Sequence, residues 1–439
     1  MKDYFDFKSL NTNLKTEVLA GITTFLATMY IIVVNPAMIS QTGMPFSGVL
    51  TATVLVSAFS SIAMGIYAKN PIVIAPGMGI NAFFTYSVVL GMSVKWEIAL
   101  GTVFWSGIIF LLLSIFNIRV MILNAIPRQL RYAISAGLGL FITFIGFANA
   151  KFIVANPATL VSIAKFNPII VTFLIGLIVT SVFVIKRIKG ALILGIVFTT
   201  LLAIPIGRFY GDASTINFGI PTLVTWQGLF SLPDFSLIFK LDIVNSLKFS
   251  LFPVILAFLF TDMFDSLSTF IGVAEAADLV DENGEPRRVK ESLIADAFST
   301  TISGLLGTSS GTAYVESATG VEEGGRTGLT AVVAGLLFLP FMFISPLLSV
   351  VPSIATAPAL ILVGVFMMKP VIKINWYRLD DAVPAFFGMV LIPLTYSITQ
   401  GIIWGFISWT IIKLVLGKKE EVSWMLIVID ALAVAALLI

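Results

Sequence analysis

Apolar segments follow one another along almost the entire chain, and most are long enough to cross a bilayer as α-helices. Such a crossing needs about 20 apolar residues. Hydropathy places crossings near residues 17–38, 47–68, 71–91, 97–117, 126–148, 168–186, 190–207, 247–273, 289–307, 309–321, 326–346, 355–369, 381–397 and 399–417. Hydrophobic residues make up 58% of the chain and charged residues 11%. The sequence therefore predicts an all-α polytopic membrane protein with 14 transmembrane segments.

Lysine and arginine are distributed unevenly between the predicted loops. Most of the 26 fall on the side that holds the N-terminus, and the other side holds Lys95, Lys151, Lys165, Arg208, Lys240 and Lys248. Cytoplasmic loops carry an excess of these residues. We therefore expect a multi-pass protein of the cell inner (cytoplasmic) membrane, with residues 1–16 as a cytoplasmic tail and 208–246 as an external loop.

The C-terminal residues 418–439 are harder to place. The run from Trp424 to Ile439 is only 16 residues long and contains Asp430. Its length fits an interfacial helix or a packed tail. It could also be a true crossing, if two of the short segments predicted above form a hairpin and do not each cross the membrane. All three alternatives stay open.

Seven predicted crossings lie in residues 17–207 and seven in residues 247–417, on either side of the external loop. Because seven is odd, a second copy of the same fold must be inverted in the membrane. Both halves have a third segment interrupted by glycine or proline, at 71–87 and 308–320. Paired interruptions of this kind mark the binding site in transporters built from inverted repeats.

The interruption in the second half is the more polar one. It reads GLLGTSSGTAYVESATGVEEGGRTG from Gly304 to Gly328 and carries Glu316 at membrane depth. Irregular backbone survives there only when it is buried in protein or lines a cavity. An extended piece before a half-helix would free N–H groups for polar or anionic ligand atoms. Asn81 and Glu316 fall one or two turns into these half-helices, so we expect both to face one cavity.

Further carboxylates lie inside predicted crossings. Asp262 and Asp265 are three residues apart on one face of the eighth segment. Asp296 lies in the ninth, where hydrogen bonding and a proton path are equally good interpretations. Each carboxylate is costly in hydrocarbon and is a candidate functional group. The chain has no histidine, so proton coupling must fall to carboxylates, and we assign it to Asp262, Glu316 and Asp296.

Aromatic residues flank these polar positions. Phe83 and Tyr314 could stack on a planar ligand. Cysteine is absent, which excludes disulfides and thiolate metal sites. We expect no metal, no cofactor and no nucleic-acid partner, and a proton gradient as the driving force.

Four stretches resemble the nucleobase:cation symporter-2 family, and within it the AzgA-like branch of purine permeases. They are GITTFLATMYIIVVNPAMIS, APGMGINAFF, FTDMFDSLSTFIGVAEAADLVDENG and LLGTSSGTAYVESATGVEEGGRTGLTA. The resemblance implies 7+7 inverted repeats divided into core and gate domains, with short strands in the third and tenth segments. It also implies proton symport of purine bases, substrate-binding positions at Asn81, Asp262, Asp265 and Glu316, and a homodimer.

The expected function is therefore a proton-coupled symporter that imports purine nucleobases by alternating access. Adenine and the oxopurines guanine and hypoxanthine both stay open as substrates. An anion transporter on the same fold is the alternative, although it would favour a basic or neutral site. A membrane protease with paired aspartates would need them on separate helices, whereas Asp262 and Asp265 share one.

Overall fold

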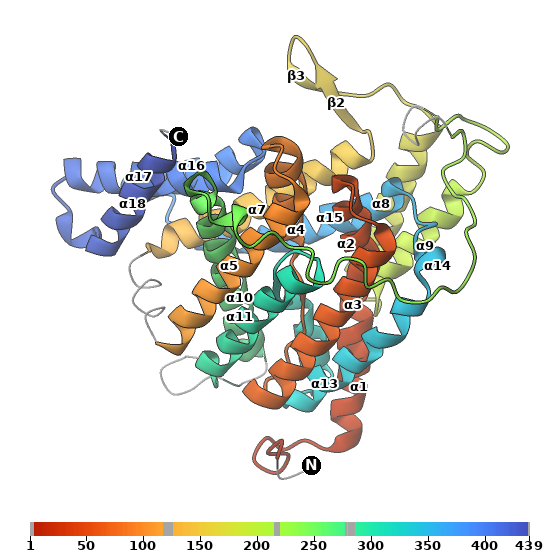
Figure 1. The fold of residues 1–439 in the computed structure, drawn as a ribbon, viewed down its shortest axis with the longest axis horizontal. Coiled ribbons are helices and arrows are strands. Elements are labelled where there is room, and N and C mark those ends of the chain that lie inside the picture. The colour runs from red at the N-terminus through yellow and green to blue at the C-terminus, as the bar shows by residue number, and fades with distance from the viewer. Residues whose placement is uncertain (1–3, 117–125, 215–219, 277–278, 280–285, 438–439) are drawn as a thin grey trace.

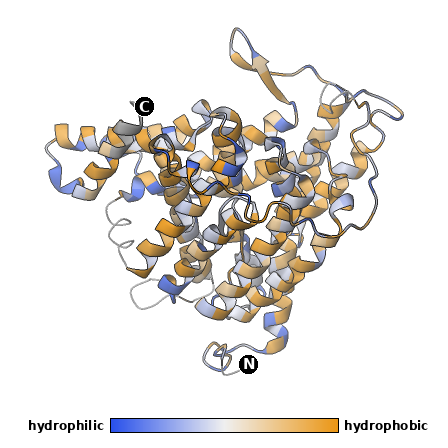
Figure 2. Ribbon diagram, viewed as in Figure 1, coloured by the Kyte–Doolittle hydropathy of each residue, from blue (hydrophilic) through white to orange (hydrophobic). Residues whose placement is uncertain are grey.

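The protein is described by a computed structural model that covers residues 4–116, 126–214, 220–276, 279 and 286–437 (Figure 1). Within these ranges, eight helical stretches are long and apolar enough to cross a membrane. They are Leu14–Thr42, Phe46–Ala68, Trp96–Ile115, Arg128–Asn149, Pro168–Ile185, Phe249–Ala274, Ser353–Lys373 and Ile398–Val415. Shorter apolar helices span Met78–Gly91, Ala191–Ala203 and Gly328–Phe343. Apolar residues predominate along most helices (Figure 2).

The first half of the chain contains nine of the described elements that matter for the site. They are α1 (Leu14–Thr28), α2 (Ile31–Ile39), α3 (Phe46–Ala63), β1 (Ile74–Pro76), α4 (Met78–Ala82), α5 (Trp96–Ile115), α7 (Arg128–Asn149), α8 (Pro168–Ile185) and α9 (Ala191–Ala203). Two π-helices, η2 (Met64–Ala68) and η3 (Phe83–Gly91), continue α3 and α4. A separate hairpin joins β2 (Ile153–Asn156) to β3 (Leu160–Ile163) and projects from one end of the molecule (Figure 1).

The second half follows a similar order. It contains α10 (Phe252–Ala276), α11 (Val289–Leu306), β4 (Gly311–Ala313), the 3₁₀ turn η6 (Val315–Ser317), α12 (Ala318–Glu322), α13 (Gly328–Phe338), α14 (Ser345–Leu348), α15 (Ser353–Met367), α16 (Leu379–Thr395), α17 (Ile398–Val415), the turn η9 (Lys419–Glu421) and α18 (Trp424–Leu437). The predicted crossings thus coincide with helices or strand–helix segments, while the count of 14 and the inverted repeat stay predictions.

The two interrupted segments cross each other through a short antiparallel sheet. Ile74 pairs with Ala313, Ala75 with Thr312, and Pro76 with Gly311. In both segments an extended piece precedes a helical one, α4 after β1 and η6 with α12 after β4. This confirms the arrangement expected from the glycines and prolines, and the two strands lie where the resemblance implied them.

Serine side chains from neighbouring helices bind the strand backbone that the pairing leaves free. On β1, the N–H of Ile74 donates to Ser61 Oγ at 3.1 Å. On β4, Gly311 N donates to Ser303 Oγ at 3.2 Å and Ala313 N to Ser266 Oγ at 3.1 Å. Unsatisfied backbone groups at membrane depth would cost several kcal/mol each, so these hydroxyls make the irregular crossing tolerable.

The helices pack in two groups. In one, α1, α3, α5, α11 and α13 contact one another and α3 and α11 flank the strands. In the other, α7, α8, α9, α15, α16 and α17 contact one another. Contacts of α10 with α5 on one side and with α7 and α17 on the other connect the groups.

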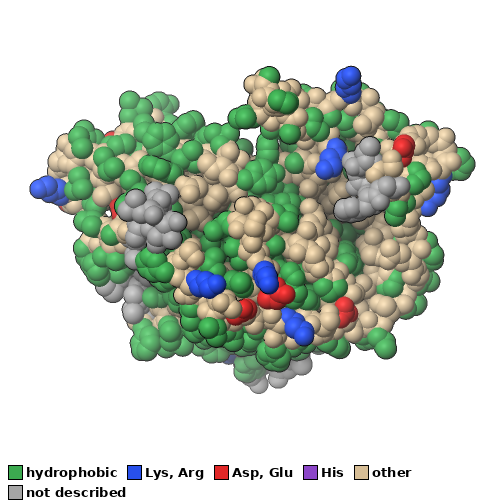
Figure 3. All heavy atoms as spheres, turned by 45° about the horizontal axis from the view of Figure 1, so that its top comes forward, with side chains coloured by type: hydrophobic (Ala, Val, Ile, Leu, Met, Phe, Trp, Pro, Cys, Tyr) green, Lys and Arg blue, Asp and Glu red, His purple; other side chains and the backbone are tan. Residues whose placement is uncertain are grey.

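The C-terminal residues form a helix that packs back along α17. Lys413 pairs with Glu421 and Thr410 Oγ1 donates to Asp430, so the two segments run antiparallel. These contacts fit each of the three alternatives for residues 418–439, which stay open. Hydrophobic side chains cover much of the face drawn in Figure 3, with Lys, Arg, Asp and Glu scattered among them.

Candidate functional site

Glu316 and Asp265 approach each other beside the strand pair. Glu316 lies in η6, directly after β4, and Asp265 lies in the middle of α10, which contacts η6. The two carboxylates are close enough to interact electrostatically. Both residues keep some solvent exposure, unlike the fully buried Asn81 nearby.

Two tyrosines border this pair. Tyr30 Oη donates a hydrogen bond to Glu316 Oε1 at 2.8 Å. Tyr314, the residue after β4, donates from its hydroxyl to the carbonyl oxygen of Pro76 at 2.6 Å. The two rings lie 6.3 Å apart at 46°. The predicted residue Tyr314 is thus part of the site, but its hydroxyl is engaged by β1.

Asn81 lies on α4 and is completely buried. Its Oδ1 accepts a hydrogen bond from Ser309 Oγ, and its Nδ2 donates to the carbonyl oxygen of Pro76 at 3.4 Å. The Asn81 amide is therefore used to hold the first strand to the segment before the second strand. It lies next to Tyr314 through their shared acceptor, Pro76.

Asp262 and Asp296 form a second, deeper group of carboxylates. Asp262 is 1% exposed and accepts a hydrogen bond from Thr300 Oγ1, which also contacts the Gly311 carbonyl at 3.2 Å. Asp296, on α11, is fully buried and interacts electrostatically with Asp262. The sequence grouped Asp262 with Asp265 and Glu316 and placed Asp296 nearer the cytoplasmic end. In the structure Asp262 and Asp296 are buried together, while Asp265, which also interacts electrostatically with Asp262, and Glu316 keep some exposure.

Phe83 is also buried rather than open to a ligand. It begins η3 and is 1% exposed. Its ring meets that of Phe258 on α10 at 4.8 Å and 60°, an edge-to-face contact. Phe83 thus joins the first interrupted segment to the helix that carries Asp262 and Asp265.

Sequence reasoning missed Tyr30, Ser309 and Thr300. All three are polar groups inside apolar segments, and each must find a hydrogen-bond partner there. That requirement is a usable signal in the sequence, but it does not identify the partner.

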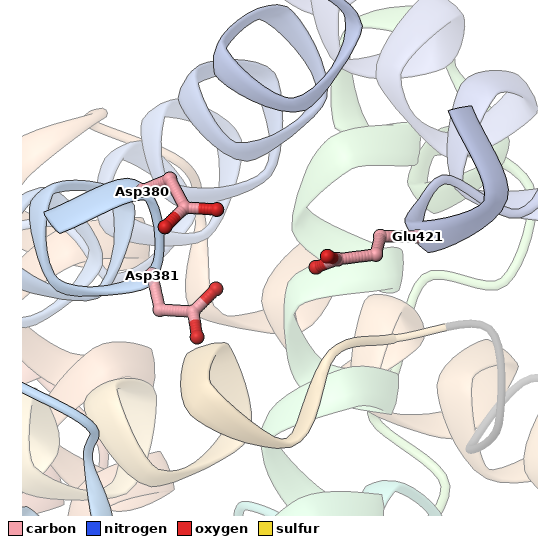
Figure 4. A group of neighbouring side chains, drawn as sticks. All are labelled: Asp380, Asp381 and Glu421. Atoms are coloured by element: carbon pink, nitrogen blue, oxygen red, sulfur yellow. The ribbon is translucent and has the colours of Figure 1, made fainter. Parts of the chain in front are cut away.

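A separate acidic cluster lies at the far end of α16. The carboxylate oxygens of Asp380, Asp381 and Glu421 come within 4.8 Å of one another and are the kind of group that binds a metal (Figure 4). Lys413 Nζ, however, lies 2.6 Å from Asp380 and Asp381 and 2.8 Å from Glu421. The lysine ammonium therefore takes the position that a cation would occupy.

Two further cations complete this cluster. Lys418 and Arg378 both pair with Asp380, and Arg378 also pairs with Glu421. Hydrogen bonds from Lys413 and Lys418 hold the pKa of Asp380 below its ordinary value, and hydrogen bonding from Lys413 does the same for the pKa of Glu421. The expectation that basic residues lie in loops is wrong for Lys413, which is fully buried within α17.

The chain is similar to known permeases over nearly its full length. The family model Xan_ur_permease, described as "Permease family", matches residues 15–403. The adenine permease AdeP of Escherichia coli is 42% identical over 98% of this chain and 94% of its own. The guanine/hypoxanthine permease PbuG of Bacillus subtilis is 44% identical over 96% of both chains.

Among solved structures, the transmembrane domain of the cyanobacterial bicarbonate transporter BicA has a similar fold. The TM-score is 0.64, over 90% of this chain and 97% of that domain, at 15% sequence identity. At this identity the likeness concerns the fold alone.

Proposed function

Because this chain belongs to the nucleobase:cation symporter-2 family, we propose that it is a proton-coupled symporter that imports purine nucleobases. The family and the relatives are permeases and not enzymes, which excludes the membrane protease considered from the paired aspartates. The protein is a multi-pass membrane protein.

The observation that carries this proposal is the partly exposed carboxylate pair, Asp265 and Glu316, beside the crossing strands. Asp265 and Glu316 come from two different elements of the second half, α10 and η6, and each could accept an N–H of a planar base. A hydrogen bond to an ionised carboxylate is about twice as strong as a neutral one. Tyr314 offers a ring whose position is fixed by its bond to Pro76. A purine edge fits two acceptors next to an aromatic wall.

Both adenine and the oxopurines remain in the proposal. Relatives of nearly equal identity are named for adenine and for guanine and hypoxanthine. These bases differ in the donors and acceptors that they present to Asp265 and Glu316, so the substrate must be measured.

Proton coupling is proposed for the carboxylates. Glu316 could exchange a proton at the substrate site. Asp262, one helical turn from Asp265 on α10, interacts with Asp296 on α11. Two carboxylates that interact through protein rather than water do not ionise independently, which is the property that a proton carrier needs. The histidine-free sequence leaves these groups as the best candidates.

Alternating access is supported by contacts of the first interrupted segment with the second helix group. Ser87 Oγ on η3 donates to the carbonyl oxygen of Tyr396, and Asn149 Nδ2 on α7 donates to Tyr86 Oη at 3.0 Å. The Tyr396 ring also lies edge-on to that of Tyr86, with ring centroids 6.4 Å apart. These contacts join the interrupted segment to the second helix group at the end assigned to the outside. We propose that they close the external entrance and that the groups act as core and gate.

An anion transporter on the same fold is the second candidate, because BicA shares the architecture. The carboxylate pair proposed to bind the substrate is acidic, and an anion would meet Asp265 and Glu316 with unfavourable charge. This electrostatic argument makes the anion alternative the weaker one. Homodimer formation and a cytoplasmic N-terminus stay part of the proposal.

The test is uptake of labelled adenine, guanine and hypoxanthine into proteoliposomes, with and without an imposed inward proton gradient. We expect one or more bases to accumulate and the gradient to stimulate uptake. Glu316→Gln should abolish high-affinity uptake while the protein remains in the membrane, and Glu322→Gln, a substitution of an exposed acid, is the matched control. Absence of uptake of every base by intact protein would refute the proposal.

A further inference from the structure

Tyr30 lies at a break in the first spanning segment. It separates α1 from α2, and a turn closes there through the bond from Val33 N to the Tyr30 carbonyl at 3.1 Å. The side chain is 1% exposed. A buried tyrosine hydroxyl in an apolar region requires a partner, so the direction in which it points is informative.

That partner is the side chain proposed to bind the base. Tyr30 Oη donates to Glu316 Oε1 at 2.8 Å, across 286 residues of sequence. The Tyr30 ring also lies 6.3 Å from the Tyr314 ring. The Tyr314 hydroxyl in turn donates to the carbonyl oxygen of Pro76 at 2.6 Å. The Tyr30 ring therefore has a fixed neighbour, and its hydroxyl has a defined direction.

We infer that Tyr30 is a positioning residue for Glu316 and, through it, a determinant of substrate selectivity. This inference rests on the proposed function. The hydroxyl binds Oε1 and fixes the orientation of the carboxylate, which leaves Oε2 to accept an N–H of the base. A carboxylate has about four lone-pair sites, so Glu316 can hold the Tyr30 hydroxyl and still accept from the base. A side chain without such a contact would sample several rotamers and lose entropy on binding.

Selectivity follows from the same geometry. A carboxylate that is fixed in place binds a ring N–H favourably. It binds a ring position that carries a methyl group or a lone pair much more weakly, since the carboxylate oxygen is then left without a hydrogen bond in the occupied site. A mobile carboxylate can turn away from the unsuitable ligand. Removing the Tyr30 hydroxyl should therefore weaken binding of the correct base more than binding of the methylated one.

The experiment measures binding to the purified full chain in lipid nanodiscs. The ligands are whichever of adenine and hypoxanthine binds the unaltered protein, and its ring N-methylated analogues. Tyr30→Phe removes only the hydroxyl, and Tyr67→Phe alters an exposed tyrosine as the control. We expect Tyr30→Phe to bind the parent base about 10- to 100-fold more weakly, with less than ~3-fold change for the analogue that the unaltered protein discriminates against most.

Equal losses for the parent base and the analogue would overturn the inference, because a merely structural role weakens both alike. A second measurement uses Glu316→Gln with and without Tyr30→Phe. If Tyr30 acts through Glu316, the double variant should bind no more weakly than Glu316→Gln alone; additive losses would contradict the inference.

The outcomes also separate the inference from the function on which it rests. Loss of binding in Glu316→Gln with full binding in Tyr30→Phe overturns the role of Tyr30 and leaves the proposed site standing. Full binding by Glu316→Gln overturns the proposed site itself. Should Tyr30→Phe fail to accumulate, Tyr30→Gln restores a donor, and recovery of selectivity in that variant supports the inference while its loss counts against it.

Discussion

Replacing Lys413 by methionine should destabilise the protein strongly. Lys413 is fully buried in α17 and lies within 2.6–2.8 Å of Asp380, Asp381 and Glu421. Coulomb's law at an effective dielectric constant of about 20 gives ~4 kcal/mol for a unit-charge pair about 4 Å apart. Burying the ammonium costs several kcal/mol, which offsets much of the attraction between Lys413 and its three carboxylate partners. Breaking such a pair on one side typically costs about 3–5 kcal/mol, and we expect this loss here.

The assay is thermal unfolding of purified protein followed by tryptophan fluorescence. With an unfolding entropy of about 2.1 cal/mol/K per residue, a loss of this size lowers the Tm of a chain this long by roughly 3–5 °C. Lys418→Met is the matched control, because Lys418 is 38% exposed and makes one contact, to Asp380; exposed pairs contribute about 0–1 kcal/mol. Equal Tm shifts in the two variants would refute the argument that burial makes Lys413 important.

Three more predictions use the same unfolding assay. The pKa values of Asp380 and Glu421 lie below their ordinary values of 3.8 and 4.5. Their contribution to the free energy of unfolding should therefore be complete at neutral pH and be lost as the pH falls below about 4.5. A Tm that rises on acidification would contradict this. Glu17→Gln should cost about 2–3 kcal/mol, because Glu17 accepts from Thr12, Thr330 and the Arg326 N–H; a Tm shift no larger than that of Glu322→Gln would count against it. Gly328→Ala should cost about 1–3 kcal/mol, because its Cβ would lie 1.9 Å from the Gly65 oxygen, while Gly272→Ala, with open space, should be tolerated; similar Tm values for the two would argue against close packing there.

The helical membrane fold and the place where the two interrupted segments cross, at which we propose the site, could be predicted because both depend on local rules. Apolar length predicts a crossing, and glycine with proline inside such a length predicts its interruption. Glu316 was found because a carboxylate at membrane depth is expensive wherever its side chain points. These arguments need no knowledge of the partner.

The partners of the polar side chains could not be predicted, because they depend on how helices rotate and cross. Counting helical turns placed Asn81 near the strands. It did not give the direction of the Asn81 amide, whose oxygen accepts a hydrogen bond from Ser309. For the same reason the sequence could not show that Asp262 is buried while Asp265, on the same helix, keeps some exposure. Tyr30 and Glu316 are 286 residues apart, a contact that no local pattern encodes.

Sheets inside membranes are usually closed into barrels, because each open edge would leave a row of backbone groups in hydrocarbon. Here Ser61, Ser266 and Ser303 stand in for the missing neighbouring strands. A sheet of three residue pairs can therefore exist in the middle of a helical bundle. Replacing one of these serines by alanine keeps the shape but reopens an edge, so tolerance at these positions should follow the hydroxyl group and not side-chain volume.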